Sequence, residues 1–253
     1  MNQLSFIGIA IITLIAITAW QSHHNKNKRY LYKNNFNVLH QNDSVIKNNN
    51  DSSQLKKSIV IILNGPSTAG KSSIQKELQK IFPQPLLAMG IDSLFVKMIP
   101  EKYFSLNSNL NNILWTTISQ DHHANRVCTL HIGQDGEKII NGMHNTIIAY
   151  AQAGNHIVVD YINYDASWFT QLQSLLKTID TIIDLYVIKI TAPLDVLERR
   201  EKERNIPHIV GHVRSHYNNV HNNVYYDLEI DTAQFSSAEC AQQIYNLICK
   251  QYS

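Results

Sequence analysis

Ile59-Val60-Ile61-Ile62-Leu63-Asn64-Gly65-Pro66-Ser67-Thr68-Ala69-Gly70-Lys71-Ser72-Ser73 is the stretch of the sequence that decides the fold. It contains a complete G-x-x-x-x-G-K-[ST] motif, preceded by an apolar run and followed by a segment with helical character. Five consecutive β-branched or leucine residues are typical of a strand that is buried on both faces. The glycines at 65 and 70 allow the backbone to curl so that successive N–H groups converge on an anion. The stretch therefore predicts a loop that binds the phosphates of a nucleoside triphosphate.

Each part of this motif has an expected role. Lys71 is expected to reach the β- and γ-phosphates of ATP, and the Ser72 hydroxyl to bind Mg²⁺. The helix that follows would present its positively polarised N-terminus to the same phosphates. The predicted cofactor-binding residues are Gly65, Pro66, Ser67, Thr68, Ala69, Gly70, Lys71, Ser72 and Ser73.

Strands alternate with helices along the rest of the chain. The further expected strands are 86–91, 156–160, 185–190 and 228–231, and the expected helices are 73–82, 142–153, 168–176, one opened by Pro193-Leu194-Asp195, and 237–251. This alternation predicts an α/β fold of the P-loop NTPase (kinase-like) class, with three layers, α/β/α, around a mostly parallel five-stranded sheet. Residues 128–140 indicate a β-hairpin around Gly133-Gln134-Asp135-Gly136, and residues 100–127 indicate a loop-rich insertion.

The N-terminal 57 residues differ in composition from the rest. Residues 4–20 form an uncharged apolar run with no basic residue before it, and Lys26, Lys28, Arg29 and Lys33 follow it. By the positive-inside rule, residues 1–21 are expected to form an N-terminal hydrophobic helix that anchors the protein in a membrane, with the kinase domain facing the cytoplasm. The alternative is a signal peptide that is cleaved, with export of the protein. Residues 22–57 are polar and rich in asparagine, which predicts a disordered tether before a P-loop kinase domain at 58–253.

The charges are also unevenly distributed. Residues 1–57 carry seven Lys or Arg and two Asp, whereas residues 58–253 carry 15 basic and 18 acidic side chains. The folded part is therefore mildly acidic, and no nucleic-acid partner is expected. The three cysteines lack the spacing of metal ligands, which favours reduced thiols.

Two aspartates follow predicted strands. Asp160 ends the apolar run 157–159, and an acid in that position is expected to complete the Mg²⁺ site with Ser72. Asp92 follows the strand that ends at Gly90, where an acid is placed to take the proton of an acceptor hydroxyl. Gly90 itself would let a substrate approach closely. The alternative for Asp92 is the N-cap of a helix.

Basic residues and histidines gather near residues 198–221. Arg200 and Arg204 are four residues apart, so a helix would place both on one face, where they are expected to stabilise the transferring phosphate. The alternative is a solvated helix in which Glu198, Glu201 and Glu203 pair with these arginines. His208, His212 and His216 recur every four residues, which is compatible either with a transition-metal site or with ordinary surface or substrate-side histidines.

Taken together, these motifs resemble those of the chloramphenicol phosphotransferase-like family of P-loop kinases. The matching segments are 62–73, Gly90-Ile91-Asp92-Ser93, 142–144, 153–160, 193–201, 220–221, Tyr226-Asp227-Leu228-Glu229-Ile230-Asp231-Thr232 and 238–241. The resemblance implies transfer of phosphate from ATP to a hydroxyl of a small molecule. It also implies that Asp92 is the catalytic base and that Arg200 and Arg204 are the lid arginines. The family's lid continues as Arg-Gly-Asp-Arg, whereas this chain has Arg204-Asn205-Ile206-Pro207.

The sequence therefore predicts an ATP- and Mg²⁺-dependent small-molecule kinase in which Lys71, Asp92, Arg200 and Arg204 are catalytic. The expected partner is an antibiotic- or metabolite-like hydroxyl acceptor, and the sequence does not predict an oligomeric state. Two alternatives stay open. One is a membrane-tethered nucleotide-binding regulatory module with little transferase activity, and the other is a toxin-like kinase that acts on a nucleotide sugar.

Overall fold

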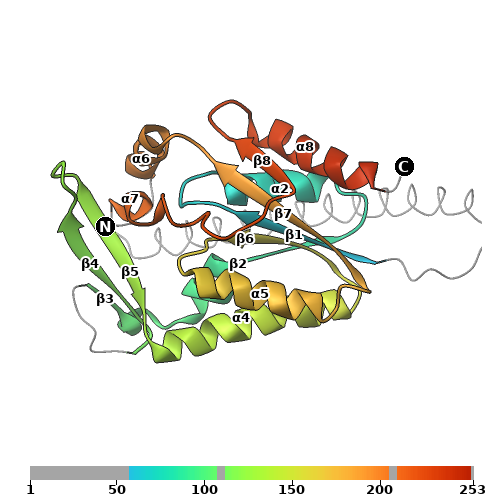
Figure 1. The fold of residues 1–253 in the computed structure, drawn as a ribbon, viewed down its shortest axis with the longest axis horizontal. Coiled ribbons are helices and arrows are strands. Elements are labelled where there is room, and N and C mark those ends of the chain that lie inside the picture. The colour runs from blue at the N-terminus through green and yellow to red at the C-terminus, as the bar shows by residue number, and fades with distance from the viewer. Residues whose placement is uncertain (1–56, 107–111, 205–209, 252–253) are drawn as a thin grey trace, which may run out of the picture. The chain divides into compact units, whose positions relative to one another are not determined.

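The computed structural model describes residues 57–106, 112–204 and 210–251. Its main feature is a parallel five-stranded sheet with the strand order β2-β6-β1-β7-β8 (Figure 1). The strands are β1 (Ser58–Asn64), β2 (Leu86–Gly90), β6 (His156–Tyr161), β7 (Ile183–Thr191) and β8 (Leu228–Asp231). The predicted fold class and each of the five predicted strands of this sheet are confirmed.

Helices cover both faces of the sheet. The helices α2 (Lys71–Ile81) and α8 (Ser237–Lys250) lie on one face, and α4 (Gln134–Gln152) and α5 (Ala166–Lys177) on the other (Figure 1). The central strand β1 is buried along its whole length, and its side chains alternate between the two layers. Val60 and Ile62 pack in the α4/α5 layer, whereas Ile61 and Leu63 pack in the α2/α8 layer. Each such side chain stabilises the fold by about 1.5–3 kcal/mol.

A second, smaller sheet contains β3 (Phe104–Leu106), β4 (Leu114–Gln120) and β5 (Arg126–Ile132). The strands β4 and β5 form an antiparallel hairpin whose turn is 121–125, not Gly133–Gly136 as predicted. The predicted hairpin was wrong because these two glycines serve close packing. A Cβ atom would lie 2.4 Å from the Asn112 carbonyl oxygen at Gly133 and 2.2 Å from the Ile113 carbonyl oxygen at Gly136. Helix α4 begins at Gln134, directly after Gly133, and contains Gly136, so it starts N-terminal to its predicted start at Gly142.

Short helices complete the fold at the carboxyl ends of the strands. They are α3 (Ile91–Leu94), η1 (Val96–Met98), η2 (Glu101–Tyr103), α6 (Leu194–Lys202) and α7 (His212–His216). Because carboxyl ends of parallel strands share one edge of a sheet, α3, α6 and the loop after β1 are neighbours although they are distant in sequence.

No helix within 57–106, 112–204 or 210–251 is long and apolar enough to cross a membrane. This finding contradicts the predicted membrane anchoring with a cytoplasm-facing kinase domain. The predicted hydrophobic helix at 1–21 lies outside the described residues, as does the predicted tether 22–57 apart from Lys57.

Candidate active site

The loop after β1 takes its shape from two glycines. A Cβ atom at Gly65 would lie 1.9 Å from the carbonyl oxygen of Ile190 in β7, so only glycine fits there. Gly70 has a left-handed conformation with φ of 89° and is the N-cap of α2. Thr68 also has a positive φ, 62°, and its hydroxyl donates to the carbonyl of Leu197 in α6. The loop is therefore fixed by contacts to β7 and α6.

The N–H groups of this loop divide into two sets. The Ala69 N–H donates to the Pro66 carbonyl at 3.3 Å, and the Ser67 N–H donates to His216 Nε2 at 3.0 Å. Within the described parts of the chain, no acceptor is found for the N–H groups of Thr68, Gly70, Lys71 and Ser72. Unpaired amides at a helix N-terminus form an anion site, so this part of the loop fits a nucleotide phosphate.

Lys71 is buried beneath this loop, with 4% of its surface exposed. Its Nζ atom donates to the Pro66 carbonyl at 2.8 Å and lies 3.5 Å from Asp160 Oδ1. Burial lowers the pKa of Lys71, whereas the Asp160 carboxylate raises it. The cation is thus held at the floor of the phosphate loop by one carbonyl and one carboxylate.

Ser72 and Asp160 form the second polar contact at this place. The Ser72 hydroxyl donates to Asp160 Oδ2 at 2.5 Å. Asp160 is brought there because β6 lies next to β1, with Asp160 opposite Leu63. A hydroxyl and a carboxylate beside a phosphate site are the oxygen ligands that Mg²⁺ prefers, so this pair fits the ion predicted from the sequence.

Asp92 lies in the first turn of α3 and lines the same cleft as Lys71, Ser72 and Asp160. It is not an N-cap, because the N-cap residue of α3 is Gly90, which makes no side-chain cap. The structure gives Gly90 a packing role, and close approach of a substrate there stays a prediction. A Cβ atom there would lie 2.7 Å from the main-chain oxygen of Asp160, so glycine allows β2 to approach β6.

The two arginines predicted to form a lid, Arg200 and Arg204, also line the cleft. Arg200 donates from Nη1 to the Thr232 hydroxyl at 2.9 Å and from Nη2 to the Thr232 carbonyl at 2.8 Å. Arg204 lies two residues after the end of α6, so the two arginines do not share one face of a helix as predicted. Both residues line the cleft, and Arg200 additionally fixes the segment after β8.

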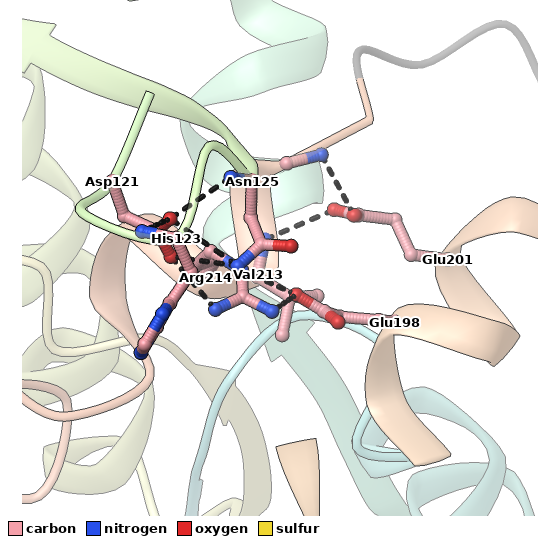
Figure 2. A network of polar contacts seen from close by, with 8 residues as sticks. Asp121, His123, Asn125, Glu198, Glu201, Val213 and Arg214 are labelled. Carbon is pink, nitrogen blue, oxygen red and sulfur yellow. Dashed lines mark hydrogen bonds and ion pairs between the residues drawn. The ribbon is translucent and has the colours of Figure 1, made fainter. Parts of the chain in front are cut away.

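Two of the three acids predicted as partners of these arginines, Glu198 and Glu201, instead hold α7, which in turn contacts the β4–β5 turn (Figure 2). The Glu201 carboxylate is buried and accepts the N–H groups of Gly211 and Val213 at 2.8 and 2.9 Å. Arg214 of α7 lies between Glu198, at 2.6 Å, and Asp121, at 3.0 Å. Their contacts join α6, α7 and the small sheet into one wall of the site.

The cleft has a volume of about 720 Å³ and reaches beyond the phosphate loop. Its far wall is formed by Leu114 and Thr116 of β4 and by Cys128 and Leu130 of β5, which lie on one face of the small sheet. Phe95, Ile162 and Tyr164 extend this wall toward Asp92. The insertion that gave no motif in the sequence therefore supplies part of the wall of the cleft.

Sequence reasoning missed the roles of His212, His216 and Tyr164. The Tyr164 hydroxyl bonds to His212 Nε2 at 2.8 Å, and His216 contacts the phosphate loop. The four-residue spacing of the histidines was the available signal, but it gives no information on contacts with residues 48 and 149 positions away. His208 lies outside the described residues, and the part of the chain that the structure covers contains no group of three or more side chains suited to a metal ion.

Comparison with known proteins shows the family. The model of the family described as chloramphenicol phosphotransferase-like protein matches residues 58–248. The chain belongs to this family. Two proteins from Mycobacterium tuberculosis, strains CDC 1551 and H37Rv, are similar to it; their names assign them provisionally to the O-phosphotransferases. Each is 22% identical over 186 residues, which cover 74% of this chain and 80% of the relative. As a member of this family, the chain has a kinase-like phosphotransferase domain.

Solved structures show the same fold at low sequence identity. The Mycobacterium tuberculosis APS kinase CysC, in complex with AMPPNP and APS, matches with a TM-score of 0.52 and 17% identity over 76% of this chain and 98% of that one. A sugar kinase from Janibacter sp. HTCC2649 matches with a TM-score of 0.50 and 12% identity over 76% of this chain and 94% of that one. These matches confirm the kinase-like P-loop fold.

Proposed function

We propose that this protein transfers the γ-phosphoryl group of ATP to a hydroxyl of a small molecule. The observation that carries the proposal is the meeting of Lys71, the Ser72–Asp160 pair and Asp92 in one cleft. Membership of a phosphotransferase family supports the reaction class, and the APS kinase that shares the fold was solved with the nucleotide analogue AMPPNP.

The donor half of the site is proposed to be the phosphate loop with Lys71. The free N–H groups of the loop and the buried ammonium group of Lys71 bind and orient the β- and γ-phosphates. Ser72 and Asp160 would hold Mg²⁺, which neutralises phosphate charge when bound. Arg200 of α6 and Arg204, two residues after that helix, stabilise the charge on the transferring group.

The acceptor half is proposed to be the space between Asp92 and the small sheet. A hydroxyl oxygen placed beside Asp92 gives its proton to that carboxylate as the oxygen forms a bond to the γ-phosphorus. The bond between this phosphorus and the bridging oxygen breaks, and ADP leaves with the electron pair. The apolar side chains of Phe95, Leu114 and Leu130 fit an acceptor with an apolar body beside its hydroxyl.

The test is ATP consumption by the full chain in the presence of a panel of antibiotic, metabolite and nucleotide-sugar alcohols. We expect acceptor-dependent formation of ADP that Asp92→Asn lowers at least about 100-fold, since general-base catalysis contributes on that order. Asp195→Asn is the matched control, because Asp195 also lies in the first turn of a helix but outside the cleft. Tight ATP binding without acceptor-dependent turnover would contradict the proposal and favour a nucleotide-binding module.

A further inference from the structure

His216 is a buried side chain of α7 that reaches the phosphate loop from a distant part of the sequence. It is 4% exposed, and its Nε2 atom lies 3.0 Å from the main-chain nitrogen of Ser67, 149 positions earlier. Its ring packs edge-on against Tyr164, with ring centroids 5.0 Å apart. None of the sequence motifs assigns a role to this histidine.

The contact with Ser67 fixes the protonation state of the ring. A main-chain N–H only donates, so Nε2 must carry a lone pair, and the ring proton is on Nδ1. The other ring nitrogen, Nδ1, lies 3.4 Å from the Ser215 hydroxyl oxygen. Burial, with His212 and Lys71 nearby, holds the pKa of His216 well below its usual range, so the ring is neutral.

The same contact occupies one of the amides of the phosphate loop. The N–H groups of Ser67 and Ala69 are occupied by His216 and by the Pro66 carbonyl. Those of Thr68, Gly70, Lys71 and Ser72 have no acceptor among the described residues and are left for a phosphate. Rotation of the Ser67 peptide would change the directions of the following amides, because they share the same backbone. The hydrogen bond from the Ser67 N–H to His216 therefore affects the conformation of the phosphate loop.

Helix α7, which carries His216, is itself held in place. The buried Glu201 carboxylate binds the N–H groups of Gly211 and Val213 at the start of α7, and Arg214 ties α7 to α6 through Glu198 (Figure 2). The Thr68 hydroxyl bonds to Leu197 of the same α6. Hence α6 and α7 approach the phosphate loop as one unit and contact two successive residues of it.

From these contacts we infer that His216 is a positioning residue for the nucleotide site: its neutral Nε2 accepts the Ser67 N–H and holds the phosphate loop in the conformation that binds the triphosphate. The inference rests on the proposed function of the loop as the ATP site. The positioning role requires the lone pair on Nε2, whereas a packing role would require only the volume of the ring.

Two substitutions of His216 distinguish the positioning role from a packing role. In His216→Gln, the side-chain oxygen can reach the Ser67 N–H in place of Nε2, whereas His216→Leu fills similar volume without an acceptor. The affinity of the full chain for AMPPNP with Mg²⁺ is measured for both variants and for Lys71→Ala. We expect His216→Leu to weaken binding about tenfold or more and His216→Gln to stay within about threefold of the original chain.

The AMPPNP affinities of the variants test the inference and the proposed function separately. Unchanged affinity in His216→Leu, or equal losses in the Leu and Gln variants, would overturn the inference while Lys71→Ala still tests the nucleotide site. Unchanged affinity in Lys71→Ala would instead overturn the proposed function. If His216→Leu does not fold, ¹⁵N spectra of the histidine rings of the original chain decide. We expect an unprotonated Nε2 at His216, and a protonated one contradicts the inference.

Discussion

The Ser72 hydroxyl donates a hydrogen bond to Asp160 Oδ2 at 2.5 Å, although 88 residues separate the two in the chain. Leu63, at the end of the central strand, lies opposite Asp160 in the parallel register of β1 and β6. The loop after β1 therefore leads to the first turn of α2, where Ser72 lies beside the Asp160 carboxylate. Sheet topology, and not local sequence, builds the proposed metal site.

This pair predicts how the reaction depends on Mg²⁺. In Asp160→Asn the carboxylate charge is lost, so we expect the Mg²⁺ concentration at half-maximal turnover to rise at least about tenfold. Ser72→Ala removes one oxygen ligand and should raise it less. Turnover is measured against Mg²⁺ at saturating ATP.

The control for this prediction is Asp165→Asn. Asp165 follows the same strand but caps α5 by accepting the Ser167 N–H at 2.8 Å, and asparagine caps a helix equally well. An unchanged Mg²⁺ requirement in Asp160→Asn would exclude Asp160 from the metal site.

Substitution of glycine by alanine is expected to have opposite effects on stability at Gly65 and at Gly142. In Gly65→Ala the new methyl group would lie 1.9 Å from the Ile190 carbonyl oxygen, so we expect a lower Tm and loss of AMPPNP binding. At Gly142 in α4 the same methyl group meets no atom within 4 Å, and alanine should raise stability by about 0.5–1 kcal/mol. Thermal unfolding of both variants tests this pair. A Gly65→Ala variant that keeps the Tm and the AMPPNP affinity of the original chain would contradict the close packing of Gly65 against Ile190.

Glu201 predicts a large loss of stability from a single carboxylate. Glu201→Ala leaves the Gly211 and Val213 N–H groups without their acceptor in a buried place, which should cost about 2–4 kcal/mol. A Tm lower by about 5–10 °C is expected for a chain of this size. Glu203→Ala, at an exposed position of the same segment, should change stability by less than about 0.5 kcal/mol. Equal effects of the two substitutions would show that Glu201 does not hold α7.

His221 predicts a fall in stability at mildly acid pH. Asn64 donates to the Tyr226 hydroxyl oxygen, so that the hydroxyl proton points to His221 Nδ1 at 2.7 Å. Burial, and then the charge of Lys189, lowers the pKa of His221 to about 4. An unfolded chain binds this proton near pH 6.5 whereas the folded one does not, so stability is lost as the pH falls from about 6.5 to about 4.

Chemical unfolding at pH 7, 6 and 5 measures this dependence. In His221→Gln we expect a smaller decrease of the unfolding free energy over this range, because the difference in proton binding is removed. His123→Gln, at an exposed position of the β4–β5 turn, is the control. An identical decrease in the original chain and in His221→Gln would contradict a neutral, buried His221.

The meeting of Lys71, Asp92 and Asp160 in one cleft was predictable from sequence because each lies at or soon after the carboxyl end of a strand. Asp92 and Asp160 were located by apolar runs that end in an acid, and parallel strands bring such ends to one edge. The β4–β5 hairpin was not predictable from Gly133 and Gly136, since glycines that allow close packing and glycines that form turns look alike in a sequence. The contact of His216 with Ser67 depends on how α7 packs, and no local pattern encodes such a long-range approach.

The fate of the γ-phosphate tests the central claim most directly. The full chain is incubated with Mg²⁺, ATP labelled in the γ-phosphate and the panel of alcohols, and the label is followed in the original chain and in Asp92→Asn. We predict that the label appears as a phosphate ester of one of the alcohols, and that Asp92→Asn abolishes this product while AMPPNP binding is retained. Label released only as inorganic phosphate, or transferred equally well by Asp92→Asn, would contradict the account.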